Sequence, residues 1–163
     1  MGVYLKAVEN LVDNLIVPPK VGVTCTFRWS MAHRLGAGYK GKCQHLHGHN
    51  YQLAVTLTGL PTKVRHGMVY DFGDLKTLFG NWLDREWDHG TVIAAHDTAL
   101  RTWCIDQHQK YYLLSADLLN STAECLLQAL LRAQADWLYG DAQMTALVLH
   151  ETEDSYASWH RAN

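Results

Sequence analysis

Three histidines have the types and the spacing of a metal site. His47 and His49 are two residues apart, so both imidazoles would leave the same face of an extended strand. His33 ends an earlier alternating stretch, and a hairpin between the two stretches would place it opposite that pair. Three neutral imidazoles suit tetrahedral Zn²⁺ with one open position, as in catalytic zinc sites. The spacing favours a catalytic zinc centre over the alternative, a set of histidines that bind no metal.

Cys43 is the candidate catalytic thiol. It precedes His47 by four residues, in the loop that must fold over the metal, and Lys42 is its neighbour. A thiol reacts as its thiolate, and nearby cations favour that form. Cys25 and Cys125 fall on apolar faces, which is typical of small buried side chains, and Cys104 has no assigned role.

Two further polar features could take part in chemistry. In Asp88-His89 the carboxylate could orient the imidazole, which could then activate a thiol or move a proton, although an ordinary surface loop can carry the same dipeptide. Glu151 falls inside a predicted strand, on the face of Leu147 and Leu149, where an acidic group needs hydrogen-bond donors. A ligand site and an edge-strand charge both remain open for Glu151.

The elements that must position these residues follow from the periodicity. Helical spacing predicts helices over residues 4–16, 71–82 and 121–139, and alternation predicts strands over 21–33, 47–57, 144–152 and 156–161. Asp71 is the expected cap of the second helix, and Ser121-Thr122-Ala123-Glu124 fits a capping box for the third. Residues 87–118 match no regular pattern and are predicted to be an irregular insertion. This order predicts an α+β fold with an antiparallel sheet.

Composition sets the class of protein. The 163 residues are 48% hydrophobic and 18% charged, with a net charge of −2 and no block of like charge. These values predict one globular domain over residues 21–163 behind a helical extension over 1–20, and no nucleic-acid or membrane partner. Charges interrupt the N-terminal apolar residues, and the cysteines form no close pair, so a cytoplasmic protein with reduced thiols is expected.

Several strings, in order between residue 27 and about residue 156, together resemble the 6-pyruvoyltetrahydropterin synthase family. They are Ala32-His33-Arg34-Leu35, residues 42–51 (KCQHLHGHNY), residues 67–76 (GMVYDFGDLK), Asp88-His89, residues 121–124 (STAE) and His150-Glu151-Thr152. The short gap between Cys43 and His47 resembles the 6-carboxy-5,6,7,8-tetrahydropterin synthases of the 7-deazaguanine (queuosine) pathway. A branch linked to folate synthesis carries glutamate in place of this cysteine, so Cys43 argues against it.

The resemblance implies a tunnelling fold (T-fold): a four-stranded antiparallel sheet with two helices on one face, joined with other subunits into a barrel, usually a hexamer of two stacked rings. It implies sites between subunits, where Asp88-His89 would reach Cys43 of a neighbour. The implied substrate is 7,8-dihydroneopterin triphosphate, with its pterin bound by Glu151 and Thr122 and its side-chain hydroxyls bound by zinc.

The implied activity is that of a lyase. Cys43 would take a proton and Asp88-His89 would relay protons, with loss of acetaldehyde and triphosphate. The alternatives are a pyruvoyl-forming synthase and a non-catalytic zinc-containing pterin-binding module.

The sequence departs from the pattern of the resemblance at two places. Ser121 stands where many relatives have proline, and the insertion before Ser121 is long.

Overall fold

The computed structural model describes residues 19–36, 38–134 and 136–162, so the helix predicted over residues 4–16 lies outside the described residues. The strands are β1 (Val21–His33), β2 (His47–Gly59), β3 (Gly90–Ile93), β4 (Tyr111–Leu113), β5 (Gln143–His150) and β6 (Tyr156–His160). The helices are α2 (Phe72–Glu86), α3 (Thr98–Asp106) and α4 (Ala123–Ala133), with short 3-10 turns η1 (Lys42–Gln44) and η2 (Lys63–Arg65). Among the described helices, none has the length and apolar character to cross a membrane.

The predicted hairpin of β1 and β2 is the centre of the structure. The two strands pair antiparallel along their whole length, from Val21 opposite Gly59 to His33 opposite His47. Alternation places every second side chain on one face, where both strands bury an apolar row: Cys25, Phe27, Trp29, Met31, Tyr51, Leu53, Val55 and Leu57. Because a shift of one residue would turn this row toward solvent, the pattern fixes the register that sets His33 opposite His47.

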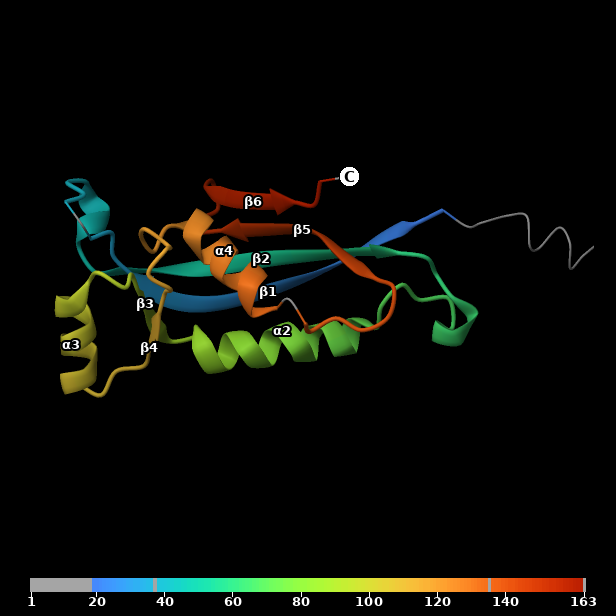
Figure 1. Cartoon of the computed structure of the whole chain (residues 1–163), viewed down its shortest axis with the longest axis horizontal. Coiled ribbons are helices and arrows are strands. Elements are labelled where there is room, and N and C mark those ends of the chain that lie inside the picture. The colour runs from blue at the N-terminus through green and yellow to red at the C-terminus, as the bar shows by residue number, and fades with distance from the viewer. Residues whose placement is uncertain (1–18, 37, 135, 163) are drawn as a thin grey trace, which may run out of the picture.

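Helices α2 and α4 cover this apolar face, and both contribute to one hydrophobic core (Figure 1). The Asp71 side chain caps α2, as predicted, and accepts a hydrogen bond from the Gly73 amide at 2.6 Å. The helix continues past the predicted end at residue 82 to Glu86, because Trp82 and Leu83 extend its buried stripe. The structure thus bears out the predicted pairing of a sheet with helices on one face.

The sheet has six strands rather than the predicted four, in the order β4-β3-β1-β2-β5-β6. The prediction of an irregular insertion over residues 87–118 was wrong, because this segment forms β3, α3 and β4. Strands β3 and β4 add parallel to the β1 edge. Every residue of β3 is buried, so it lacks the alternation that identifies a half-buried strand. Helix α3 lacks a clear pattern for a different reason: its apolar residues Trp103 and Ile105 are exposed, so the apolar positions do not form one face.

Helix α4 also differs from its prediction at both ends. Thr122 is the cap, rather than Ser121, and its hydroxyl accepts a hydrogen bond from the Cys125 amide at 3.4 Å. The helix ends at Ala133 instead of near residue 139. Beyond it, Trp137 packs on Phe79 of α2, with ring centroids 5.2 Å apart. The apolar residues after 133 therefore belong to the core without continuing the helix.

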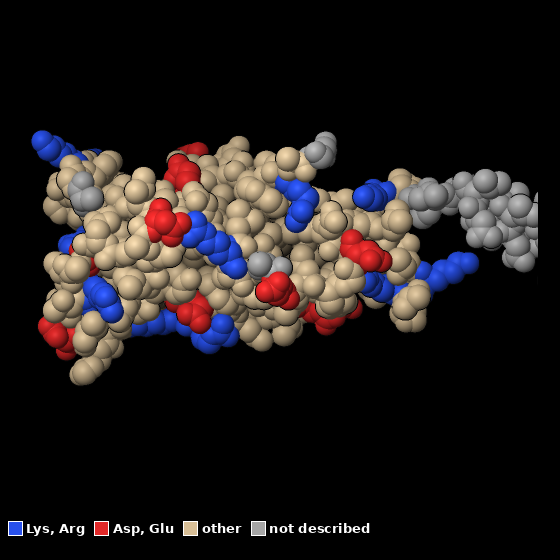
Figure 2. All heavy atoms as spheres, in the orientation of Figure 1, with Lys and Arg blue, Asp and Glu red and all other residues tan. Residues whose placement is uncertain are grey.

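Charged side chains are scattered over the face shown in Figure 2, and both signs are interspersed there. One charged pair has a structural role: the Arg34 side chain, just past β1, donates from Nε and Nη2 to the two Asp97 carboxylate oxygens, each at 2.7 Å. Asp97 also caps α3 by accepting from the Leu100 amide. This pair connects the inserted β3-α3-β4 unit to the end of β1.

We expect the Arg34–Asp97 pair to make the free energy of unfolding depend on pH in the acidic range. The hydrogen bonds from Arg34 hold the pKa of the Asp97 carboxyl below its usual range. The stabilisation that the ionised Asp97 gives the folded protein is therefore fully present above the ordinary aspartate pKa of about 3.9. It is lost as the pH falls through the lower pKa that Asp97 has in the folded state. Asp97→Asn should reduce the free energy of unfolding at pH 7 by about 1–3 kcal/mol. Denaturant titrations should show this difference shrinking below pH 4, whereas a difference that stays constant down to pH 3 would contradict the assignment.

Candidate metal centre and active site

The three predicted histidines converge at one end of the β1–β2 hairpin. Each contributes a ring nitrogen, and the three nitrogens lie within 4.8 Å of one another. In the described part of the chain this is the one group of three or more His, Cys, Asp or Glu side chains with such spacing. His33 is buried, whereas His47 and His49 are half-buried. The structure thus confirms that these histidines come together and could bind a metal.

Backbone carbonyls orient two of the rings. His33 Nδ1 lies 2.6 Å from the Ser121 carbonyl oxygen, and His47 Nδ1 lies 2.7 Å from that of His45. A carbonyl oxygen only accepts hydrogen bonds, so each Nδ1 carries a proton and, in the neutral ring, Nε2 presents a lone pair. Metal-binding histidines show this arrangement, with the second ring nitrogen donating to a carbonyl. The rings are therefore set to present Nε2 to a cation.

The Nε2 atoms of His33 and His49 are also available to bind a cation. Nε2 of each ring is buried without an aligned hydrogen-bond partner among the described residues. Burial, which opposes protonation, holds the pKa of His49 below its usual value; the Glu151 carboxylate counteracts part of this effect, and the neighbouring His33 and His47 add to it. The ring is thus neutral at neutral pH, which is the form that binds metal. Three imidazole nitrogens directed to one point are the donor set of a catalytic zinc site.

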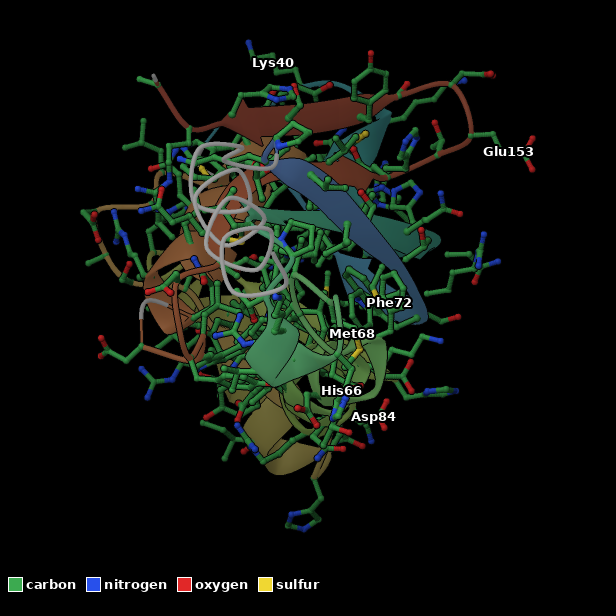
Figure 3. The ribbon with its side chains drawn as sticks, turned by 90° about the vertical axis from the view of Figure 1, so that its right-hand side faces the viewer. Lys40, His66, Met68, Phe72, Asp84 and Glu153 are labelled. Carbon is green, nitrogen blue, oxygen red and sulfur yellow. The ribbon has the colours of Figure 1, made fainter. Side chains whose placement is uncertain are left out.

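Glu151 lies beside these nitrogens. Its Oε1 is 2.9 Å from His33 Nε2 and 3.3 Å from His49 Nε2. The adjacent His33 imidazole holds the pKa of the Glu151 carboxyl below its usual range, so the group is ionised at neutral pH. The prediction that Glu151 lies inside a strand was wrong, since β5 ends at His150 and Glu151 begins the turn to β6. The turn directs the carboxylate to the histidines, whereas Glu153, two residues later, points away from the molecule (Figure 3).

A cavity of about 250 Å³ joins four of the predicted site residues. His33, Cys43, Thr122 and Glu151 all line it, from β1, η1, the N-terminal cap of α4 and the β5–β6 turn respectively. The Cys43 side chain is a half-buried free thiol. A glutamate, a cysteine, a threonine and a histidine thus line one small space together with apolar residues, and a few polar groups within an apolar lining are typical of ligand pockets.

The Asp88–His89 pair lies elsewhere on the chain. Asp88 Oδ2 is 2.8 Å from His89 Nδ1, and Asp88 Oδ1 accepts a hydrogen bond from the Ser30 amide at 3.1 Å. The His89 side chain is 83% exposed and borders a different cavity, which it shares with His49 and Asn50. The carboxylate contacts the ring, and the exposed position of His89 also fits an ordinary surface loop. No contact within the described chain brings this ring to Cys43.

Two features of the site escaped the sequence analysis. The first is the pair of carbonyls that orient His33 and His47, which carry no residue-type signal because every residue has a carbonyl group. The second is Tyr51, whose fully buried hydroxyl has no hydrogen-bond partner in the described chain. Burial raises the pKa of Tyr51 far above its usual value, so its hydroxyl remains protonated. The alternation that places His47 and His49 on one face also places Tyr51 there, and it could have identified this residue.

Comparisons with known proteins identify the family and the fold. A family model described as 6-pyruvoyl tetrahydropterin synthase matches residues 22–162. A protein of Rickettsia typhi named 6-carboxy-5,6,7,8-tetrahydropterin synthase is 34% identical over 140 residues, which cover 82% of this chain and 97% of that protein. A protein of the same name from Rickettsia bellii is 38% identical over 106 residues, covering 63% of this chain and 72% of that one.

Solved structures show the same architecture. The 6-pyruvoyl tetrahydropterin synthase of Caenorhabditis elegans superposes with a TM-score of 0.68 at 22% identity, covering 90% of this chain and 99% of that one. An uncharacterised protein of Wolinella succinogenes gives the same TM-score at 19% identity, covering 89% of this chain and 100% of that one. These likenesses confirm the predicted T-fold. Together with the family match and the similarity to the Rickettsia typhi protein, they show that the chain belongs to the 6-pyruvoyl tetrahydropterin synthase family.

Proposed function

We propose that this protein is a zinc-dependent 6-carboxy-5,6,7,8-tetrahydropterin synthase. It would convert 7,8-dihydroneopterin triphosphate and one water molecule to 6-carboxytetrahydropterin, acetaldehyde and triphosphate, in 7-deazaguanine (queuosine) biosynthesis. The observation that supports this most is the cavity where His33, Cys43 and Glu151 meet. The curated relatives of the chain that carry the carboxy-forming name add to that support.

His33, His47 and His49 would hold the zinc ion. Bound there, zinc would act as a Lewis acid toward the substrate hydroxyls, which makes neighbouring protons easier to remove. The protein would contribute two features that the geometry supports: ring tautomers fixed by carbonyl oxygens, and burial that keeps His49 neutral. Both features favour binding of a cation at neutral pH.

Glu151 would bind the pterin ring. An ionised carboxylate can accept two parallel hydrogen bonds from neighbouring N–H groups, which is the pattern that a pterin ring edge offers. Thr122, on the same cavity, would add a hydrogen bond while its hydroxyl also caps α4. The ring would then occupy the cavity that Glu151 and Thr122 both line.

Cys43 would remove a substrate proton inside the cavity, and the Asp88–His89 pair would relay protons from a neighbouring subunit. The exposure of the His89 side chain leaves it free to reach across an interface. Strands β4 and β6 are the sheet edges of the described chain, and pairing of such edges between subunits would protect them. We therefore propose a homo-oligomer, a hexamer of two stacked rings, with active sites between its subunits.

The test of this function is product analysis. The purified, zinc-loaded protein is incubated with 7,8-dihydroneopterin triphosphate, and acetaldehyde, triphosphate and the pterin products are quantified. Acetaldehyde and a 6-carboxy pterin in equal amounts are expected. Triphosphate release without acetaldehyde would identify a pyruvoyl-forming enzyme, and binding without turnover would identify a pterin-binding module. Either result would overturn the proposal.

Replacing Glu151 by glutamine should separate substrate binding from metal binding. The loss of charge-assisted hydrogen bonds worth about 1.5–3 kcal/mol should weaken pterin binding by about 10- to 100-fold. Zinc content should remain at the wild-type level, since the three imidazoles are intact. Calorimetric titration with a pterin and metal analysis measure the two effects. Glu153→Gln, in the same turn but pointing outward, is the matched control. If Glu151→Gln lost zinc instead, the carboxylate would be a metal ligand and the binding role would be refuted.

A further inference from the structure

Arg34 and Ser121 connect the metal ligand His33 to two other parts of the chain. Arg34 directly follows His33, and its backbone carbonyl accepts a hydrogen bond from the Ser121 hydroxyl at 2.9 Å. The Ser121 carbonyl in turn accepts from His33 Nδ1 at 2.6 Å. Ser121 is fully buried, so both contacts are shielded from water. One serine thus fixes the orientation of the ring and the path of the chain beside it.

Asp97 continues this connection into the insertion. Its carboxylate accepts both hydrogen bonds from the Arg34 guanidinium, and only 8% of its side chain is exposed. Asp97 is itself fixed at the start of α3, whose Leu100 and Cys104 form a small separate core with Ile93. Bidentate pairs of arginine and carboxylate impose a defined geometry on both partners. The inserted unit is therefore a rigid support for the segment that follows His33.

A serine at position 121 adds a contact that proline could not make. A proline would keep the carbonyl that orients His33, but it would lose the hydrogen bond to the Arg34 carbonyl. The contacts with Ser121 and Asp97 thus fix the Arg34 backbone and side chain at once.

We propose that Asp97 and Ser121 are positioning residues for the metal centre, acting through Arg34 to hold the His33 imidazole toward His47 and His49. The proposal rests on the proposed metal site. It adds that one contact from the β3-α3-β4 insertion, the Arg34–Asp97 pair, contributes to metal affinity, because this pair fixes the segment that follows His33. Partners of metal ligands typically change metal affinity by about 10- to 100-fold when they are replaced.

The test compares the zinc affinity of full-length variants by competition with a chromophoric chelator. Asp97→Asn should bind zinc about 10-fold more weakly than wild type. Its Co²⁺-substituted form should show an altered visible spectrum, because those bands report coordination geometry. Asp117→Asn is the matched control: it removes an equally bidentate pair, Arg132 with Asp117, whose two side chains are 50% and 62% exposed. The control should keep wild-type affinity and spectrum. Ser121→Ala should weaken zinc binding in the same direction as Asp97→Asn.

A second pair of variants separates positioning from general loss of stability. Leu100→Ala loosens the small core of the insertion but leaves the Arg34–Asp97 pair in place. It should lower the unfolding temperature yet keep the zinc affinity measured well below that temperature. Asp97→Glu, which retains the carboxylate, should recover part of the affinity. Unchanged zinc affinity in Asp97→Asn, or equal losses in Asp97→Asn and Leu100→Ala, would overturn the inference alone. A wild type that binds no zinc would overturn the metal site with it.

Discussion

Replacing His47 by alanine should give a folded protein that binds no zinc and has lost at least about 10³-fold of its activity, because a Lewis acid supplies several kcal/mol of transition-state stabilisation. His47 lies at the start of β2 and is half-buried, and its one side-chain hydrogen bond within the described chain is to the His45 carbonyl in its own loop. Its removal should therefore leave the core intact while taking away one of three ligands.

The control for this variant is His45→Ala. The His45 side chain is exposed, and the group that it contributes to the site is its backbone carbonyl, which alanine retains. Metal analysis, circular dichroism and acetaldehyde release should therefore match wild type. Full zinc content in His47→Ala, or equal losses in both variants, would show that the imidazole of His47 is not a ligand.

Replacing Cys43 by alanine should abolish most of the turnover without loss of metal. General base catalysis contributes about 10²- to 10⁴-fold, so the rate of acetaldehyde release should fall within that range. The Cys43 backbone carbonyl accepts a hydrogen bond from the Leu35 amide at 2.7 Å, and this contact, which fixes the loop, survives the substitution. Zinc content and pterin affinity should stay close to wild type.

Cys125→Ala is the matched control, because Cys125 is also a free, half-buried cysteine but lies on α4 and does not line the cavity. It should retain wild-type turnover. A Cys43→Ala protein with undiminished turnover would show that the Cys43 thiol is not the group that removes the substrate proton.

The group of three histidines could be predicted because its geometry is local to one hairpin. Alternation determines which face each residue of β1 and β2 occupies. The length of the loop between the strands determines their register, which places His33 opposite His47. The α2 cap at Asp71 was equally visible, because a side chain that caps a helix acts within a few residues of itself.

The remaining parts depend on contacts between distant segments. Ser121 looked like the cap of α4 because the local pattern fits one, whereas the structure uses its hydroxyl and carbonyl on Arg34 and His33, some 90 residues earlier. The strands β3 and β4 have short buried sequences whose pairing with β1 leaves no periodic signal. Glu151 was expected inside a strand because nothing in the residue types shows that β5 ends one position earlier.

Titration of zinc into the metal-stripped wild-type protein, with turnover of 7,8-dihydroneopterin triphosphate measured at each step, tests the catalytic metal centre most directly. Activity should rise in proportion to added zinc and reach a plateau at about one ion per chain, the stoichiometry of a three-histidine catalytic site. Full activity in the stripped protein, or a protein that takes up no zinc, would contradict the account.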